Sequence, residues 1–467
     1  MVSFFKAPKA KKATKRKHRS PHAQRQGKLL LSEVAVDSLE HHGFGVAKES
    51  AVAATVAHPV IFVEGALPGE VCDVRITQQK RQVWFGTAER VTQPSSLRVP
   101  AFCPHAQVCG GCQLSHIDPQ SVRPLRREAI KELLERIAGV TDYQWLPDLQ
   151  AEPRGYRRKT RLAIDARDAN DVRIGFRQQG TNQVVDIPSC EVLTQPLQVL
   201  LAAIREWLKC GNAVRKIGHI SLFEGDEGCL ICVRSTGKLD ATALNSLHEL
   251  GITHKAKIDV VHPNGQSDSM GAEQLRICYS PHQDISIRVG ADDFVQINDS
   301  VNRQMVNQVL TWLDDLNVTT VMDLFCGTGN FSMPLAKQGY RVTGVEGVQN
   351  MVERARDTAA QYALNQCSFL HHDLLNPNSV NALLGTAVDA VILDPSREGA
   401  LEVCRQLAPH NQPNLVYVSC NPASFARDAH ALIGNGYQLK RLALVEMFAY
   451  TKHTELISLF QPAQMMK

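Results

Sequence analysis

The sequence predicts three folded regions: a small all-β region, an α+β middle region and a C-terminal α/β region built on a doubly wound parallel sheet. Three patterns support this prediction. Short alternating apolar and polar runs with turn signals extend from about residue 29 to 98, and further short strand-like runs between about 150 and 290 predict an antiparallel sheet in the middle region. From about residue 291, strand-like runs alternate with helical spacers, which is typical of a doubly wound sheet.

A chain of 467 residues is long enough for about three cores. We therefore expect domains at 29–98, 99–290 and 291–467, preceded by a disordered tail at 1–28. The tail has ten Lys/Arg and no acid, whereas the remaining chain has 41 Lys/Arg against 47 Asp/Glu. A basic tail on a mildly acidic body favours nucleic acid as the partner, and a solubilising arm is the alternative.

The composition is that of a globular protein, with 44% hydrophobic and 21% charged residues. No apolar run approaches the roughly 18 residues of a membrane span, and no apolar core follows the N-terminal charges as in a secretory signal. Thirteen cysteines in a chain of this length are dilute. We therefore expect no membrane association and a reducing, cytoplasmic setting.

A glycine turn, Asp323-Leu-Phe-Cys-Gly-Thr-Gly-Asn330, follows the first of five strands expected at 320–325, 341–346, 368–372, 388–393 and 415–419. Glycines there let the backbone approach a ligand. Glu346 ends the next strand, where a carboxylate can accept hydrogen bonds from ribose hydroxyls. These features fit either NAD or S-adenosylmethionine. Asp373 and Asp394, at the ends of the third and fourth strands, favour S-adenosylmethionine.

Two groups of cysteines carry candidate chemistry. Cys103, Cys109 and Cys112 have the spacing of a metal or iron–sulfur site and need a fourth ligand; four thiolates fit zinc or a four-iron cluster. Cys420 ends the fifth strand of the expected sheet, where ligands bind, so we favour a nucleophile over a buried structural cysteine. Glu455 begins a late strand that can return to the same pocket, and a surface carboxylate is the alternative.

A second cysteine pair, Cys229 and Cys232, has metal-like spacing but lies in an apolar strand-like run. Residues three apart on a strand face opposite sides, so we interpret this pair as core packing. The basic run Arg154-Gly-Tyr-Arg-Arg-Lys-Thr-Arg161 suits phosphates and stacked bases, with a charged strand edge as an equal alternative.

The all-β region resembles the TRAM domain, an RNA-binding barrel of the oligonucleotide-binding type, through Gly43-Phe-Gly-Val-Ala47 and Phe62-Val-Glu-Gly-Ala-Leu-Pro-Gly-Glu70. On pattern alone it could equally be a packing module. Over almost its whole length, the chain resembles the RNA uracil-C5 methyltransferases. The matching segments are Phe294-Val-Gln-Ile-Asn298, the turn at 323–330, Asp394-Pro-Ser-Arg397, Val418-Ser-Cys-Asn-Pro422 and His453-Thr-Glu455.

This resemblance implies a class I (Rossmann-like) methyltransferase domain, an N-terminal TRAM barrel and an α+β iron–sulfur central domain. It implies S-adenosylmethionine as the donor and, from the combination of barrel and cysteine site, 23S ribosomal RNA as the substrate, with uridine 1939 as the target. Cys420 would add to uracil C6 and Glu455 would remove the C5 proton. Phe294 would stack on the flipped base.

The resemblance also implies the ligands of both cofactors. The implied contacts to the methyl donor are Gln296, Phe325, Asn330, Glu346, Asp373 and Asp394. The implied ligands of a [4Fe–4S] cluster are Cys103, Cys109, Cys112 and Cys190. One departure is Ser396, because the family usually has a second proline there; we expect only a modest local change.

Other functions stay open at this point. Within enzymes, the same reaction on another ribosomal RNA site or on tRNA is the main alternative, and a radical enzyme is less favoured because its cluster cysteines are normally closer together. An inactive RNA-binding assembly factor is possible, although Cys420 and Glu455 together argue against it. We expect a monomer without an obligate protein partner.

Overall fold

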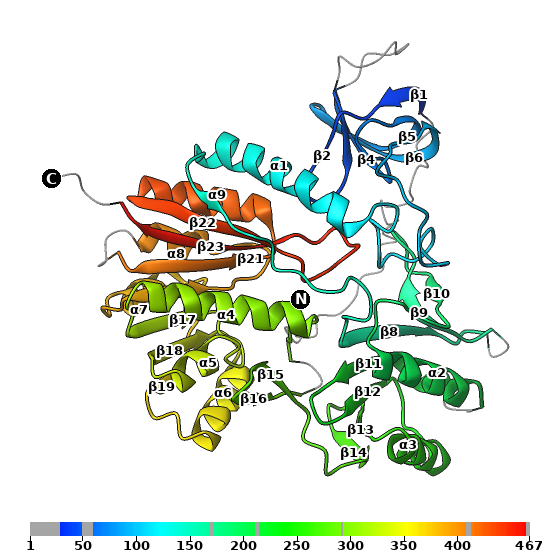
Figure 1. The fold of residues 1–467 in the computed structure, drawn as a ribbon. Coiled ribbons are helices and arrows are strands. Elements are labelled where there is room, and N and C mark those ends of the chain that lie inside the picture. Colours follow the sequence, from blue (N-terminus) through cyan, green and yellow to red (C-terminus); the bar gives the residue numbers. More distant parts are fainter. Residues whose placement is uncertain are drawn as a thin grey trace, which may run out of the picture. The chain divides into compact units, whose positions relative to one another are not determined.

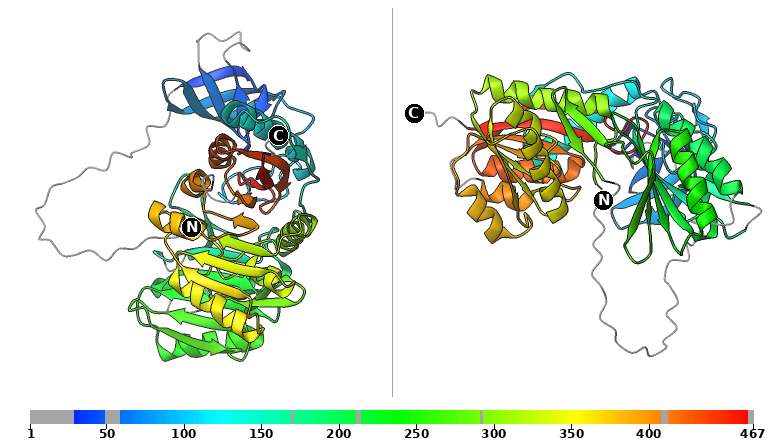
Figure 2. Two further views of the ribbon diagram at one scale, coloured as in Figure 1. Left: turned by 90° about the vertical axis from the view of Figure 1, so that its left-hand side faces the viewer. Right: turned by 90° about the horizontal axis from the view of Figure 1, so that it is seen from below.

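The structure is a computed structural model that describes residues 29–48, 59–168, 171–210, 214–290, 293–407 and 412–463. The basic tail at 1–28 lies outside the described residues. The chain divides into two compact units, Met1–Arg98 and Val99–Lys467. Figure 1 labels the elements of each unit, and Figure 2 gives two further views.

The first unit is all-β, as the alternating pattern predicts. Its six strands form one sheet in the order β1-β5-β6-β4-β3-β2. In β5 the side chains of Cys72, Val74 and Ile76 are buried, whereas those of Asp73 and Arg75 are partly exposed. The period of two therefore places one face of this strand in the core. The strands are β1 (Leu30–Ala35), β2 (Ser38–Leu39), β3 (Gly45–Ala47), β4 (Val60–Glu64), β5 (Val71–Gln79) and β6 (Val83–Gln93).

The C-terminal part of the second unit is built on an eight-stranded sheet with the order β19-β18-β17-β20-β21-β23-β22-β7. The five strands β17 to β21 are parallel, and β23 pairs antiparallel with both β21 and β22. The doubly wound sheet is confirmed, with each predicted parallel strand within two residues of its expected bounds. The strands are β7 (Gln144–Trp145), β17 (Thr320–Leu324), β18 (Arg341–Glu346), β19 (Cys367–His371), β20 (Ala390–Leu393), β21 (Asn414–Ser419), β22 (Tyr437–Val445) and β23 (Glu455–Pro462).

Helices cover both faces of this sheet (Figure 1). Helix α1 packs with α9, and Ile130 and Leu134 of α1 share a core with Phe425 of α9. The predicted boundaries 99–290 place the residues of α1 and β7 in the middle region, yet α1 packs on the eight-stranded sheet and β7 pairs with β22 in it. An amphipathic pattern does not specify which sheet a helix covers. The helices are α1 (Pro119–Ala138), α4 (Asp299–Asp315), α5 (Ser332–Lys337), α6 (Gln349–Gln361), α7 (Pro377–Leu384), α8 (Leu401–Gln406) and α9 (Pro422–Gly434).

The middle part of the second unit is a seven-stranded sheet with the order β10-β9-β8-β11-β12-β13-β14, and α2 and α3 lie beside it (Figure 1). The sequence pattern predicts an antiparallel sheet, but β12 and β13 are parallel. Helix α3 connects these two strands, and such a crossover permits parallel pairing. The elements are β8 (Lys159–Asp165), β9 (Arg173–Arg177), β10 (Val184–Asp186), α2 (Gln195–Cys210), a 3-10 turn (Val214–Lys216), β11 (Ile217–Glu224), β12 (Cys229–Ser235), α3 (Ala241–Thr253), β13 (Ala256–Val261) and β14 (Ser267–Gly271).

The middle and C-terminal parts share a continuous core. Tyr156, Phe223 and Tyr279 from the middle part belong to the same buried cluster as Trp312 and Phe331. A short hairpin, β15 (Cys278–His282) with β16 (Ile285–Arg288), lies between the two sheets in the chain and adds Ile285 and Ile287 to this cluster. Among the described helices, none is long and apolar enough to cross a membrane.

Candidate active site

The polar side chains that the sequence places after parallel strands meet at one edge of the sheet. Phe325 follows β17, Glu346 ends β18, Asp373 lies after β19, Asp394 follows β20 and Cys420 follows β21. These strands pair in parallel, so their carboxyl ends share an edge. This arrangement brings the expected donor contacts and the expected nucleophile to one region.

The glycine turn after β17 needs a backbone that few side chains tolerate. Gly327 and Gly329 have φ of 58° and 97°, and Phe325 also has a positive φ of 65°. Glu346 holds this turn, because one of its carboxylate oxygens accepts a hydrogen bond from the Gly327 amide at 3.1 Å. Its other oxygen accepts from the Val348 amide at 2.9 Å. These two hydrogen bonds therefore hold the Glu346 carboxylate between the ends of β17 and β18.

Two amide side chains near this turn differ in their partners. Asn330 forms a reciprocal pair with Asn302, whose side chain is fully buried: each Nδ2 donates to the other Oδ1, at 2.9 and 3.0 Å. Gln296 is also buried, but its Oε1 accepts no hydrogen bond from any described residue. A buried acceptor without a partner costs free energy, so Gln296 is suited to a ligand with N–H groups.

Buried carboxylates cluster along the same edge. Burial raises the pKa of Asp323 to about 7, and a nearby charge on Glu346 adds to this effect. One Asp323 oxygen accepts from the Ser332 hydroxyl, whereas Oδ1 has no partner among the described residues. Burial and the charge of Asp323 also raise the pKa of Asp394 to about 7, although this side chain is partly exposed. A site with several carboxylates is complementary to a cationic ligand.

Cys420 and Glu455 lie close enough for the Glu455 carboxylate to raise the pKa of the Cys420 thiol. Burial, together with the carboxylates of Glu455 and Asp394, raises the pKa of the Cys420 thiol to about 12. Burial, with Asp394, raises the pKa of Glu455 to about 8, and its Oε2 has no partner among the described residues. Register places them together, because β23 pairs with β21 up to Leu456 opposite Ser419. The structure thus brings together the two residues that the sequence assigns to catalysis.

A cation that the sequence analysis does not single out lies beside both groups. Arg397 opposes the upward pKa shifts of Cys420 and Glu455. Its Nη2 donates to Nδ1 of His453 at 2.9 Å, and its backbone oxygen accepts from Nδ2 of Asn421 at 2.9 Å. Arg397 could have been found from the sequence by its position directly after Asp394-Pro395-Ser396, which places a flexible cation at the end of a strand.

The four cysteines of the expected metal site converge from two segments. Cys103, Cys109 and Cys112 lie in the loop before α1, and Cys190 lies between β10 and α2. Burial, together with the charges of Cys190, Cys109 and Cys103, raises the pKa of Cys112 to about 12. Backbone N–H groups point at two of the sulfurs: that of Gly111 at Cys109, and those of Val192 and Leu193 at Cys190. Such contacts are typical of metal-binding thiolates.

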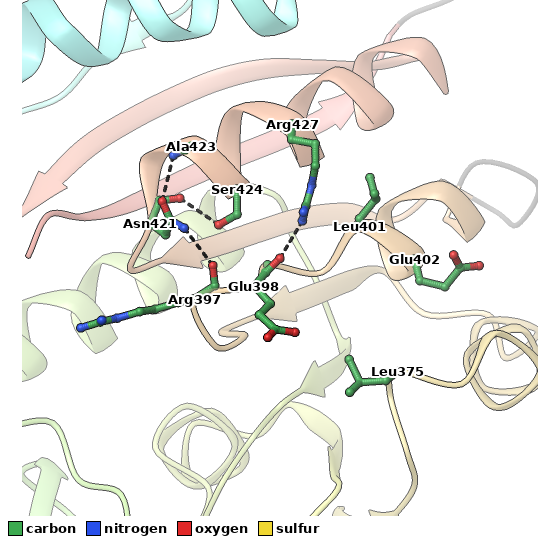
Figure 3. Close-up of a pocket in the computed structure, with 10 residues that line it drawn as sticks. Leu375, Arg397, Glu398, Leu401, Glu402, Asn421, Ala423, Ser424 and Arg427 are labelled. Atoms are coloured by element: carbon green, nitrogen blue, oxygen red, sulfur yellow. Dashed lines mark hydrogen bonds between the residues drawn. The ribbon is translucent and has the colours of Figure 1, made fainter. Parts of the chain in front are cut away.

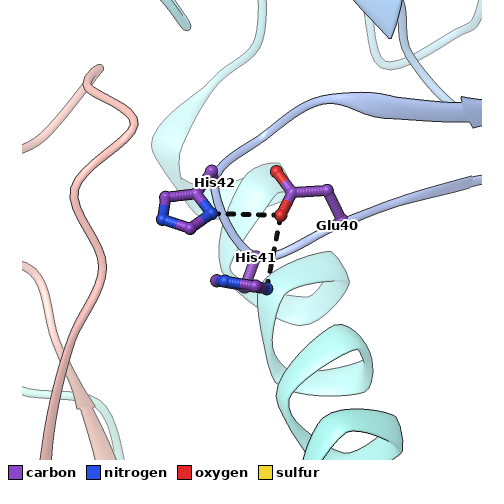
Figure 4. Close-up of side chains that lie close together, drawn as sticks. All are labelled: Glu40, His41 and His42. Carbon is purple, nitrogen blue, oxygen red and sulfur yellow. Dashed lines mark hydrogen bonds and ion pairs between the residues drawn. The ribbon is translucent and has the colours of Figure 1, made fainter. Parts of the chain in front are cut away.

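A different group of potential ligands lies in the first unit (Figure 4). Glu40 Oε2 is 3.3 Å from Nδ1 of His41 and 3.2 Å from Nδ1 of His42. Within the described ranges, it is the only group of three His, Cys, Asp or Glu residues whose ligand atoms all lie within 4.8 Å of one another. Burial would raise the pKa of Glu40, but hydrogen bonds and charge from the histidines outweigh it and lower the pKa. We interpret this group as an ion-pair cluster in a turn.

Cys229 and Cys232 are both buried in β12, as the strand interpretation predicts. Phe294, in contrast, is 59% exposed, which leaves its ring available to a ligand.

A glycine turn, strand-end carboxylates and a thiol at the carboxyl edge of a parallel sheet define a methyltransferase of the doubly wound class. Family profiles agree with this class. A profile described as "Methyltransferase domain" matches residues 321–409, one described as "tRNA (Uracil-5-)-methyltransferase" matches 380–461, and one described as "TRAM domain" matches 32–88.

The chain belongs to the family of 23S rRNA (uracil(1939)-C(5))-methyltransferases. A relative of that name, RlmD from Alteromonas mediterranea, is 38% identical over 431 residues, which are 92% of this chain and 88% of the relative. The relative of the same name from Shewanella piezotolerans is 36% identical over 99% of both chains. The one from Pseudomonas fluorescens is 38% identical over 86% of this chain and 87% of the relative. The expected family membership and the TRAM domain are confirmed.

Among solved structures, the fold is similar to that of the Pyrococcus abyssi tRNA (uracil-54, C5)-methyltransferase in complex with S-adenosyl-L-homocysteine. The TM-score is 0.69 over 92% of this chain and 100% of that chain, at 22% identity. This similarity confirms the class I methyltransferase fold.

Proposed function

We propose that this enzyme transfers a methyl group from S-adenosylmethionine to C5 of a uracil in 23S ribosomal RNA, at the position that corresponds to uridine 1939. Its family relatives are named for that reaction. The observation that carries the proposal is the pairing of the Cys420 thiol with the buried Glu455 carboxylate at the edge where the strand-end carboxylates gather. An inactive assembly factor would have no use for a base with a pKa raised to about 8 beside a thiol.

Uracil C5 is a weak nucleophile, so the reaction needs a covalent step. The Cys420 thiolate forms a bond to C6, and the C5–C6 π electrons move toward C5 and O4. C5 then takes the methyl group from the sulfonium of the donor. Glu455 accepts the C5 proton, the C5–C6 double bond forms again, and the C6–S bond breaks to return the thiolate.

The charges around Cys420 fit this sequence of steps. In the site itself, Glu455 and Asp394 oppose ionisation of the thiol and Arg397 favours it. The sulfonium of S-adenosylmethionine supplies a second positive charge and the methyl group. A cation beside these groups favours the ionised thiol and the ionised Glu455, which the reaction requires. Gln296 Oε1 and Asp323 Oδ1, which have no hydrogen-bond partner among the described residues, also fit a ligand with cationic or N–H groups.

Further donor contacts are proposed from the strand ends. Glu346 would accept from the ribose hydroxyls and Asp373 from the adenine amino group, with Phe325, Asn330 and Asp394 completing the set. The two hydrogen bonds between Asn330 and Asn302 indicate that Asn330 fixes the turn after β17, in addition to its proposed contact with the donor. The exposed Phe294 would stack on the target base once that base leaves its stack.

We also propose that Cys103, Cys109, Cys112 and Cys190 hold a [4Fe–4S] cluster in the middle region. Zinc with S ligands at about 2.3 Å holds its four sulfurs roughly 3.8 Å apart. No three of these thiols are gathered within 4.8 Å in the part of the chain that the structure describes, so the spacing fits a larger cluster better. The transfer consumes no electrons, so the group is structural here. Iron content and visible absorption of anaerobically purified protein test this, and stoichiometric zinc without iron would overturn it.

Tritium release tests the main proposal. Unmodified 23S ribosomal RNA labelled at uridine C5 is incubated with the donor and the enzyme, and with the Cys420→Ala variant as the control. Release that requires both donor and Cys420 supports C5 methylation through this thiol, and mapping of the product then tests position 1939. Release from tRNA alone would move the assignment to another RNA, and release from neither would favour the assembly factor.

A further inference from the structure

A pocket lies next to the catalytic groups, on the same edge of the sheet (Figure 3). It has a volume of about 600 Å³ and is lined by residues that follow β19 and β20 and by the start of α9. Arg397 and Asn421 line it, and these residues directly adjoin the site: Asn421 follows Cys420, and Arg397 lies beside the thiol and Glu455. Its volume is within the usual range for a ligand pocket.

The wall formed by the loop after β20 is held rigidly by α9. Asn421 Nδ2 donates to the Arg397 oxygen, and Arg427 Nη2 donates to the Glu398 oxygen at 2.7 Å. Asp428 is fully buried and accepts from the Ala400 amide at 2.7 Å. Three points of the loop backbone are therefore fixed before any ligand binds, which makes this wall preorganised.

A glycine allows this close approach. Gly399 has a φ of 78°, and a Cβ there would lie 2.4 Å from Oδ2 of Asp428. Asp428 Oδ2 also accepts from the Tyr417 hydroxyl at 2.7 Å, and Asp428 Oδ1 accepts from Arg427. The loop thus packs directly on a satisfied buried network, and its side chains at 397 and 398 are left to face outward.

The outward-facing wall combines an apolar side chain with a carboxylate. Leu375 lines the pocket, and 65% of its side chain is exposed and available for contact with a ligand. The exposed Glu398 carboxylate makes no hydrogen bond or ion pair with a described residue, whereas Glu402 is occupied by Gln406 at 2.7 Å. In Figure 3, Glu398 lies between Arg397 and Leu375.

We propose that this pocket binds an unpaired nucleobase of the RNA substrate, adjacent to the target uracil, through Glu398 and Leu375. A carboxylate repels phosphate but accepts from the amino group of a base, and an exposed leucine contacts a base face. The ligand is therefore a base with an exocyclic amino group: adenine, cytosine or guanine. This inference rests on the proposed function, because it assigns a second base site on the same RNA.

The test measures kcat and KM for a 23S ribosomal RNA fragment, and KM for the donor, in wild type, Glu398→Ala and Leu375→Ala. The control is Glu132→Gln, which removes an exposed charge on α1. Loss of the Glu398 contact should raise KM for the RNA roughly tenfold, because one good base contact discriminates by about that factor or more. The control should match wild type.

A chemical cycle makes the assignment specific. Each base that flanks the target is replaced in turn by an analogue without its amino group. At one position, the replacement should cost wild type roughly tenfold in kcat/KM and cost Glu398→Ala almost nothing, because the lost partner is already absent. Additive losses at every position, or unchanged KM for RNA in Glu398→Ala, would overturn the proposal. A raised KM for the donor instead would assign the pocket to the adenosine part of the donor.

These outcomes separate the two proposals. If wild type methylates the RNA but the Glu398 and Leu375 variants behave as Glu132→Gln does, only the base pocket fails. If wild type methylates no ribosomal RNA, the proposed function itself fails.

Discussion

The two cysteine regions of this enzyme differ in what surrounds the sulfur. Cys420 lies among unlike groups: the carboxylates of Glu455 and Asp394 and the guanidinium of Arg397. Cys112 lies mainly among like groups: Cys190, Cys109 and Cys103. Each thiol has a pKa of about 12, with burial as the main cause, although Arg397 lowers the pKa of Cys420 and Arg157 that of Cys112. Neither sulfur is therefore a thiolate without a positive charge beyond these arginines.

This difference separates reactivity from binding. One thiol beside a base and a cation can form and break a bond, because a different group carries out each step. Four thiols in one place raise one another's pKa, and a multiply charged metal centre relieves that repulsion for all of them together. We therefore expect a change at Cys420 to alter rate and a change at Cys112 to alter stability.

The largest expected effect is on turnover at Cys420. Cys420→Ala should lower methylation by at least roughly 10⁴-fold, because the covalent step has no substitute nucleophile. Its midpoint of thermal unfolding and its iron content should remain those of wild type, since Cys420 is not among the four cysteines proposed to hold the cluster. Single-turnover methylation, thermal unfolding and iron analysis measure these three quantities. Substantial residual methylation would show that the Cys420 thiol is not the nucleophile. The proposed difference between a reactive thiol at Cys420 and metal-binding thiols in the four-cysteine region would then be wrong.

The next effect concerns Glu455. Glu455→Gln should lower turnover by about 10²- to 10⁴-fold, the usual contribution of a general base. Addition of the thiol and methyl transfer do not need this base, so the enzyme should stall as a covalent adduct with methylated RNA.

A denaturing gel with labelled RNA shows that adduct as a slow band. The double variant Cys420→Ala with Glu455→Gln is the control and should give no such band. Normal turnover of Glu455→Gln without a slow band would remove Glu455 from the role of base.

The four-cysteine region should respond in the opposite manner. Cys112→Ser should lower the iron content and reduce the midpoint of thermal unfolding by at least roughly 5 °C, as expected for loss of a structural metal group. Cys420→Ser is the matched control, with the same substitution in the other region, and should keep its iron. Equal iron loss in both variants would mean that the two regions are not independent.

The sequence predicts the catalytic edge well because each strand is an apolar run followed by a polar residue. In a parallel sheet, five such ends must meet, so Asp394 and Cys420 could be placed together without coordinates. The strand ends indicate Glu346, Asp373 and Asp394 as donor contacts, and spacing indicates Cys103, Cys109 and Cys112 as metal ligands. The other donor contacts and Cys190 come from the family resemblance, and all of these roles stay predictions here.

Contacts between distant side chains were not predictable. Arg397 and His453 are 56 residues apart, and Asn302 and Asn330 are 28 apart. Neither pair has a sequence pattern, because side-chain contacts depend on how elements pack rather than on local periodicity. For the same reason, the amphipathic pattern of α1 did not show that it covers the C-terminal sheet, and nothing local indicated that β12 and β13 are parallel.

The smallest effect is the pH dependence of stability that the carboxylates at the catalytic edge produce. The folded chain holds a proton on Glu455 up to a pH of about 8, whereas the unfolded chain loses it near the ordinary pKa of 4.5. Between these values the folded state binds more protons, so its stability must fall as pH rises. One such proton contributes at most about 1.4 kcal/mol per pH unit. The Cys112 thiol, whose pKa burial and neighbouring thiols raise from 9.0, stays protonated in both states over this pH range, so it should add nothing to this slope.

Urea unfolding at several pH values between about 5 and 8 measures the slope. Glu455→Gln cannot titrate, so its free energy of unfolding should fall less steeply than that of wild type. Asp323 and Asp394, whose pKa values are raised to about 7, contribute to the remaining slope, as does Glu446, whose pKa burial also raises. Glu132→Gln, at an exposed site, should retain the wild-type slope. Parallel curves for wild type and Glu455→Gln would mean that Glu455 is already ionised in the folded protein. The positive charge of Arg397 would then keep Glu455 ionised even without the donor. The Cys420 site and the four-cysteine site would in that case differ only in the reactivity of their thiols.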